Sequence, residues 1–296
     1  MDAVLALMNA VFLAFIVSTM LNVGLVTSID QLTGILRNAR WLAAALVASL
    51  VAVPLIGWGV AEVFPLEGAA YVALVLVACS PGAPFAVALT TIQRGDVVAG
   101  AASMAILAVV GSLTTPLTVD FIIGAGEVAE AGGGSIKVGE LVLSIVALQI
   151  VPFAVGMAMK AWVPDIAVAW QALVKKISSV TFGLVILSIV IGGFQQVIDL
   201  IGSWILVASL VASLGWLIAG AVLAPAPRAT RVTGGILASS RNAGPVLLIA
   251  TASFADVEGV IPATISVFIV LLVTQVVVAS WFGKRDAKLV GEALPA

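Results

Sequence analysis

Residues 237–245 read Leu-Ala-Ser-Ser-Arg-Asn-Ala-Gly-Pro and place one arginine, Arg241, in the middle of a long apolar run. It is the only charged residue deep inside any of the long apolar runs, and two hydroxyls, an amide and a helix-breaking Gly-Pro pair surround it. A charge at the centre of a bilayer costs roughly 2.5 to 3.5 kcal/mol, so it persists mainly where a partner stabilises it. We therefore expect this stretch to help form a substrate site.

The composition indicates an integral membrane protein. Of the 296 residues, 62% are hydrophobic and 9% are charged, and the mean hydropathy is +1.26, more than a soluble domain of this size needs for its core. The chain has no histidine and one cysteine, Cys79, which excludes an internal disulfide and Cys/His metal sites. Because it also lacks ATP-binding and zinc-protease motifs, we expect no enzyme, no cofactor and no nucleic-acid partner.

Nine stretches are long and apolar enough to span a bilayer, which takes about 20 residues at 1.5 Å of rise each. They cover residues 3–27, 40–62, 68–92, 97–122, 139–160, 177–199, 203–224, 232–253 and 260–283. We therefore predict an all-α membrane protein with nine transmembrane helices. Residues 160–177 form an inner connection in this prediction, and their start has the amphipathic character of a segment lying on the membrane surface.

Basic residues favour one side of the predicted membrane. Eleven of the 13 Lys and Arg residues fall in every second connection, Lys137 lies on the other side, and Arg241 lies within the membrane. Lys and Arg collect in cytoplasmic loops. We therefore expect a multi-pass protein of the inner (plasma) membrane, with the N-terminus outside and the C-terminus in the cytoplasm.

Two of the predicted helices carry a helix-breaking sequence at their middle, segment 68–92 and segment 232–253. The predicted break residues are Pro81, Gly82, Pro84, Gly244 and Pro245. Proline removes an N–H donor and clashes with the preceding turn, so each helix is expected to unwind. Such backbone is tolerated at membrane depth only where protein or a water-filled cavity surrounds it. The simpler alternative is a pair of ordinary proline kinks without function.

The two breaks occupy corresponding places if the first helix of a five-helix repeat is absent. Each lies in the penultimate segment of its half, and the two segments run in opposite directions, as in inverted-repeat secondary transporters. The predicted parts are an N-terminal repeat of four helices (1–124), an outer linker (125–138), a C-terminal repeat of five helices (139–284) and a cytoplasmic tail (285–296).

The string SPGAPFAVALTTIQRGD at residues 80–96 resembles the bile acid:sodium symporter family, as does Ser-Leu-Thr-Thr-Pro-Leu at 112–117. Further matching stretches are Asn-Val-Gly-Leu at 22–25, Pro-Leu-Ile-Gly at 54–57 and Arg-Asn-Ala-Gly at 241–244. The resemblance spans nearly the whole chain. It implies two broken helices that cross, and a core of segments two, three, four, seven, eight and nine that moves against a panel of segments one, five and six.

The resemblance also implies transport of a small organic anion by alternating access, but the chain departs from the sodium-coupled members. Those members have a Ser-Asn pair where this chain has Ala86 and Val87, and an acid and a Gln where it has Leu237 and Arg241. Sodium needs a shell of oxygen ligands, which these residues do not supply. The sequence leaves open sodium symport, a sodium-independent carrier that is proton-linked or facilitative, and a channel or non-transporting membrane subunit.

We predict that Arg241 offers a fixed, planar fork of donors to the organic anion. The predicted substrate-binding residues are Arg241, Asn242, Ser239, Ser240, Ser80, Thr114 and Thr115. Half-helix starts just past Pro81 and Gly244 would add N–H donors. In the alternative, Arg241 braces the fold by donating to carbonyls that the unwound helices leave free. Gln149 in segment five either lines the pathway or bonds between helices. Substrate identity and oligomeric state are not indicated.

Overall fold

The computed structural model describes residues 2–125, 138–192, 198, 202–225, 227–254 and 257–290. The described chain is helical, with one isolated β-type bridge between Pro81 and Arg241. Its helices are α1 (Asp2–Val26), α2 (Ile29–Arg37), α3 (Ala39–Val47), η1 (Ala48–Ala52), α4 (Val53–Val63), α5 (Gly68–Ala78), α6 (Ala86–Ile92), α7 (Val97–Ala125), α8 (Val138–Ile145), η3 (Val146–Ile150), α9 (Val151–Trp162), α10 (Pro164–Gly192), α12 (Trp204–Leu223), α13 (Arg228–Ser239), α14 (Ala243–Ser253) and α15 (Val260–Val290). Most of the predicted outer linker and the end of the predicted tail lie outside the described residues.

Several helices are long and apolar enough to cross a membrane, which makes the chain an integral membrane protein. Within the described ranges these are Ala39–Val63, Val97–Ile123, Val142–Trp162, Trp204–Leu223 and Val260–Asp286. A sixth arises if α1 and α2, which meet at a bend of 77°, count as one span. The predicted segments 68–92 and 232–253 each form a pair of shorter helices, α5 with α6 and α13 with α14.

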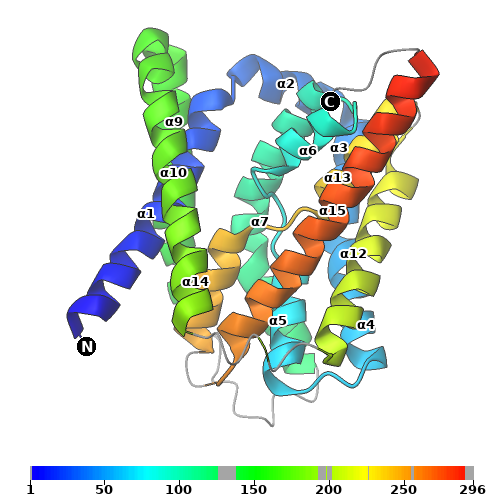
Figure 1. The fold of residues 1–296 in the computed structure, drawn as a ribbon. Helices are drawn as coiled ribbons and strands as arrows, with labels where there is room; N and C mark the ends of the chain where they lie inside the picture. Colours follow the sequence, from blue (N-terminus) through cyan, green and yellow to red (C-terminus); the bar gives the residue numbers. More distant parts are fainter. Residues whose placement is uncertain are drawn as a thin grey trace.

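The connections alternate between two ends of the molecule (Figure 1). The α1–α2 bend, α6, the α9–α10 turn, the start of α13 and the end of α15 share one end, and the α4–α5 connection lies at the other. Arg37 ends α2, Lys160 lies in the last turn of α9 and Arg228 begins α13. The basic connections predicted to share one side of the membrane therefore do share one end of the fold.

Residues 160–177, predicted as an inner connection, are helical except at Val163. Helix α10 begins at Pro164 and runs without a break to Gly192. Proline suits the first position of a helix because the N–H that it lacks would have no partner there, and Asp165 stabilises the positive end of the helix. The predicted spanning stretch 177–199 therefore begins inside α10, because the helix-starting chemistry at Pro164 begins the helix before the apolar run.

Small residues let neighbouring helices approach closely. Helix α1 packs against both α9 and α10, and a Cβ on Gly24 would lie 2.2 Å from the Phe153 carbonyl oxygen. On the other side of the molecule α12 packs along α13, where a Cβ on Gly220 would lie 2.2 Å from the carbonyl oxygen of Gly234. Close backbone approach of this kind replaces the hydrophobic driving force that helices lack in lipid.

We expect Gly220→Ala to lower the free energy of unfolding by about 1 to 3 kcal/mol, because its methyl group meets backbone and not a movable side chain. The matched control is Gly59→Ala in α4, where a Cβ meets nothing within 4 Å. Melting temperatures of the detergent-purified variants measure the difference. Equal melting temperatures of Gly220→Ala and Gly59→Ala would contradict the packing described for α12 and α13.

Candidate functional site

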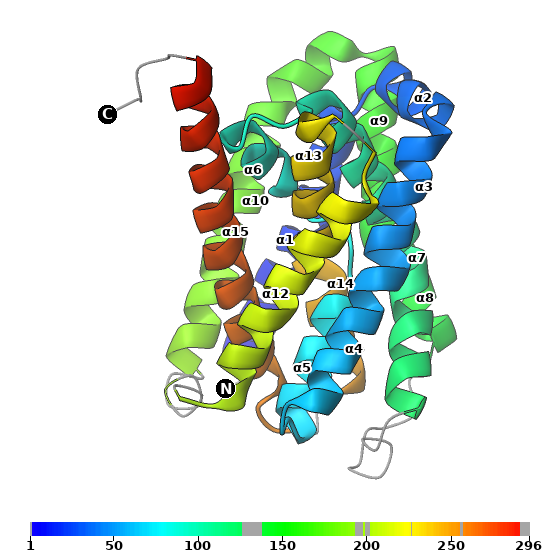
Figure 2. The ribbon, with the colours of Figure 1, turned by 90° about the vertical axis from the view of Figure 1, so that its right-hand side faces the viewer.

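The two breaks meet near the middle of the molecule. The non-helical residues are 79–85 between α5 and α6 and 240–242 between α13 and α14, and together they are called the crossover below. An isolated antiparallel bridge joins Pro81 to Arg241, and the Asn242 N–H donates to the Ser80 carbonyl at 2.7 Å. Figure 2 shows α6 and α13 toward one end and α5 and α14 toward the other, so the two segments run in opposite directions.

The first break leaves three successive carbonyls without helical partners, and each finds a donor elsewhere. The Ala78 oxygen accepts from Arg241 Nη1 at 3.0 Å, and the Cys79 oxygen accepts from Thr115 Oγ1 at 2.9 Å. The Ser80 oxygen accepts from the Asn242 backbone. Unsatisfied backbone groups at membrane depth cost several kcal/mol. These bonds are therefore what allow the chain to unwind there.

The Arg241 guanidinium binds carbonyls from three helices. Besides Ala78, Nη1 donates to the Ser49 oxygen at 3.2 Å, and Nη2 donates to the Ala238 oxygen. Arg241 is 0% exposed, and its Cζ lies 6.0 Å from the centroid of the Trp216 ring. No carboxylate in the described part of the chain forms an ion pair with it. The positive charge is thus solvated by neutral oxygens.

The Ser49 carbonyl is available to Arg241 because of a proline. The η1 segment is π-helical, and the Val53 N–H bonds to the Ala48 oxygen five residues earlier. In the same register the Ser49 oxygen would accept from residue 54, but Pro54 has no N–H. Ser49 itself is 0% exposed. The freed oxygen therefore needs a donor from another helix, and Arg241 supplies it.

The predicted hydroxyls on α13 are held by a residue of α15. Gln275 Nε2 donates to Ser239 Oγ at 3.1 Å, and Ser240 Oγ donates to Gln275 Oε1 at 3.5 Å. All three residues are at most 1% exposed. The sequence analysis did not select Gln275, although an uncharged amide within the last apolar segment was a signal for it. These serines are part of the crossover's support in this conformation.

The remaining predicted residues divide into two groups. Thr115 on α7 contacts the crossover, within bonding distance of both the Cys79 and Gly111 oxygens. Ser80, in the crossover, is 0% exposed with no protein partner for its Oγ. Thr114 bonds to its own helix through the Val110 oxygen at 3.0 Å. The structure thus brings together all the predicted binding residues except Thr114.

The half-helix starts differ from the prediction on one side. Helix α6 begins at Ala86, not just past Pro81, because residues 79–85 stay non-helical. Gly82 has φ +90°, and a Cβ there would lie 2.3 Å from the Ala108 backbone nitrogen. The break therefore packs closely on α7 at Gly82. Helix α14 does begin at the break, at Ala243 with Asn242 as its N-cap.

The two broken segments are also joined away from the crossover. Gln93 Nε2, just past α6, donates to the Val232 oxygen at 2.8 Å, and the Asp96 N–H donates to Thr233 Oγ1 at 2.8 Å. Both acceptors lie on α13. The two broken segments are thus joined both at the crossover and at one end.

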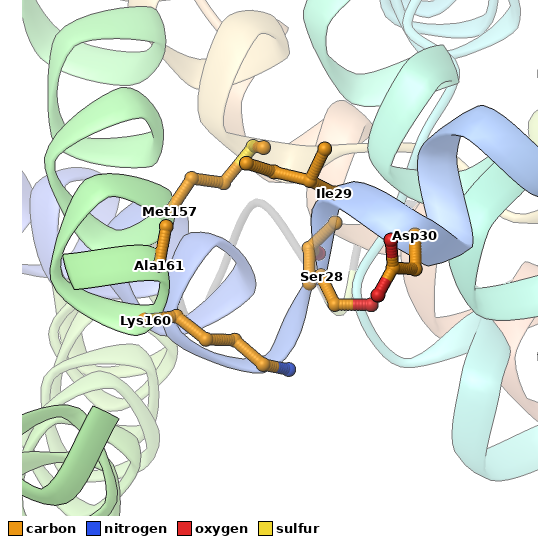
Figure 3. A pocket seen from close by; sticks show the side chains of 7 residues that line it. Ser28, Ile29, Asp30, Met157, Lys160 and Ala161 are labelled. Carbon is orange, nitrogen blue, oxygen red and sulfur yellow. The ribbon is translucent and has the colours of Figure 1, made fainter. Parts of the chain in front are cut away.

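A surface pocket of about 380 Å³ lies at the α1–α2 bend, away from the crossover (Figure 3). Ser28 and Asp30 border it from α2, and Lys160 reaches across from α9. Lys160 Nζ donates to the Val26 carbonyl, which α1 leaves free at its end. The pocket therefore marks a helix-end contact, and it contains none of the predicted binding residues.

One comparison with known proteins identifies a relationship. A family model described as the sodium bile acid symporter family matches residues 12–200. The match includes the first break and ends before the second. A comparison with curated proteins gives no match. The resemblance seen at residues 80–96 and 112–117 is thereby confirmed for that part of the chain.

We expect Arg241→Met to lower the free energy of unfolding by at least about 2 kcal/mol, because three buried carbonyls lose their donor. The control is Arg231→Met on the exposed face of α13, which should stay within about 0.5 kcal/mol of the parent. Thermal melting in detergent measures both. A variant at position 241 that melts with the parent would show that these carbonyls do not depend on the guanidinium.

Proposed function

The chain belongs to the sodium bile acid symporter family, and we propose that it is a secondary transporter that moves a small organic anion across the membrane by alternating access. The observation that carries this proposal is the uncompensated charge at the crossover. Arg241 is buried among neutral carbonyls, with no carboxylate bound to it in the described chain. A buried positive charge in this setting favours an anion nearby.

We propose nine membrane spans arranged as an inverted repeat with a missing first helix. The antiparallel meeting of the two broken segments supports this arrangement. The packing of α1 with α9 and α10, apart from α12 and α13, supports a panel and a core that move against each other. In this proposal the crossover belongs to the core, and α1, α8 to α10 and η3 form the panel.

The orientation proposed from the loop charges places the basic end of the fold in the cytoplasm. Arg37, Lys160 and Arg228 lie at helix ends that share that end of the molecule, together with the end of α15. Lys and Arg near helix ends anchor cytoplasmic loops. The N-terminus would then lie outside the inner membrane.

Sodium-independent transport is the form of the proposal that the crossover geometry favours. Backbone carbonyls are ligands that a hard cation uses, and the Arg241 guanidinium already bonds to those of Ser49, Ala78 and Ala238. Leu237, where sodium-coupled relatives carry an acid, is buried and apolar. The arginine thus acts as a tethered cation in the place where a free one would otherwise be stabilised.

The coupling is tested with purified protein in liposomes and labelled cholate, pantothenate and pyruvate as probes. We expect saturable uptake of at least one acid, and its rate should change by less than about twofold when sodium is replaced by potassium. The reason is that the guanidinium needs no ion from solution. Uptake that requires a sodium gradient would overturn the sodium-independent form. Electrical conductance far above carrier rates would favour a channel.

Arg241→Gln should reduce uptake of the transported acid at least tenfold, because the positive charge is lost while an amide remains. Arg231→Gln removes an exposed arginine from the same helix and serves as the control. Both variants are first checked by gel filtration and melting, so that misfolded protein is excluded. Parental uptake by folded Arg241→Gln would leave the arginine with a bracing role alone.

A further inference from the structure

A small space beside Gly244 is bordered by two side-chain amides. The position of a Cβ on Gly244 would lie 3.4 Å from Asn242 Oδ1 and 3.8 Å from Gln149 Nε2. Asn242 precedes α14, and Gln149 lies in η3, on the helical segment formed by α8, η3 and α9. The two amides therefore meet from different parts of the fold, above the first turn of α14.

Each of these amides has its oxygen bonded and its nitrogen free. Asn242 Oδ1 accepts from the Gly244 N–H at 3.1 Å, and Gln149 Oε1 accepts from Ser112 Oγ at 3.2 Å. Asn242 Nδ2 and Gln149 Nε2 have no protein partner, although Asn242 is 3% and Gln149 1% exposed. Buried polar groups normally find a partner. A simple interhelical bond explains Gln149 Oε1 but leaves the two NH₂ groups unexplained.

Asn242 Nδ2 and Gln149 Nε2 are both hydrogen-bond donors, so their partner must be an acceptor. Helix α14 has 11 residues, and its N-terminus carries the positive end of the helix dipole toward the same place. Arg241 is the residue before Asn242 and adds a full positive charge nearby. Donors, dipole and charge together select a negatively charged oxygen ligand, such as a carboxylate.

We propose that Gln149 and Asn242 form an amide clamp that binds the carboxylate of the transported substrate beside Gly244, an inference that rests on the function proposed above. The carboxylate would bond to the panel through Gln149 and to the core through Asn242. Binding would therefore hold the panel and the core together around the substrate. Gln149 becomes a specificity-determining residue, whereas the sequence left open whether it lines the pathway or bonds between helices.

The π-helical turn presents Gln149 in this position. The Val151 N–H bonds to the Val146 oxygen, five residues earlier, and Pro152 follows without an N–H. A π-turn is wider than an α-turn, and such turns occur frequently at functional sites. The widened turn brings an amide from the panel to the start of α14.

Gly244→Ala separates a binding role from a structural one. The added methyl group meets nothing closer than 3.4 Å, which is ordinary van der Waals contact, and alanine favours helix more than glycine does. We expect an unchanged or higher melting temperature without ligand, together with a KM for the transported acid that rises at least tenfold. A variant with parental KM would overturn the clamp, because the methyl group fills the space between the amides.

Gln149→Glu tests the charge of the ligand with almost no change of shape. Where the new carboxyl group is ionised, one oxygen still accepts from Ser112, while the other replaces the free NH₂ and repels an anion, so uptake is compared over a range of pH. We expect at least tenfold weaker uptake of the transported acid among cholate, pantothenate and pyruvate. The control is Gln171→Glu, which adds the same charge at a half-buried position of α10 and should leave uptake unchanged.

Probe chemistry and binding distinguish failure of the clamp from failure of transport. If pantothenate is the transported acid, its alcohol analogue panthenol should not raise the melting temperature of the parent, and cholate is compared with its methyl ester in the same way. Parental uptake by both Gly244→Ala and Gln149→Glu would refute the clamp while transport stands. A parent that neither transports nor is stabilised by any of the three acids would refute the proposed function and the clamp together.

Discussion

The fold depends on how unwound backbone is satisfied in a medium that offers no water. Two helices unwind at the same depth, and the carbonyls that they release must accept hydrogen bonds from protein. Arg241 supplies much of that need, because one planar group donates to Ser49, Ala78 and Ala238 on three separate helical segments. The guanidinium costs free energy to bury in lipid, and its hydrogen bonds to these carbonyls stabilise the unwound backbone.

The crossover has a rigid side and an unsatisfied side. Toward α7, α13 and α15, the first break packs through Gly82 and the α13 serines bond to Gln275. Toward η3, buried donors on Gln149 and Asn242 lack partners. The bonded side is held by protein contacts alone, whereas the unpaired donors leave bonding capacity for a ligand. The bonded serines and Gln275 thus support the crossover, and the free donors of Gln149 and Asn242 are available to a ligand.

The sequence predicted a helical membrane protein and both breaks, because apolar length and Gly-Pro chemistry act locally, whereas its nine spans stay a prediction. It also identified Arg241 and most of its neighbours, since a lone charge in an apolar run is visible without a structure. The sequence did not predict the acceptors of Arg241, because the free Ser49 carbonyl arises from a π-turn whose register depends on tertiary packing. Gln275 was missed and the role of Gln149 was left open for a related reason: an amide's partner, or its lack of one, appears only once distant helices are in place. The sequence also placed the start of a spanning stretch at residue 177, whereas α10 begins at Pro164, before the apolar run.

The missing N–H of Pro54 makes two distant positions interdependent. Pro54 removes the helical donor that the Ser49 carbonyl would otherwise have, and the guanidinium donates to that oxygen instead. A residue with an N–H at position 54 would compete for the Ser49 oxygen and weaken one of the two bonds that Arg241 Nη1 makes. We therefore expect positions 54 and 241 to vary together across evolutionary change, although more than half the length of the chain separates them.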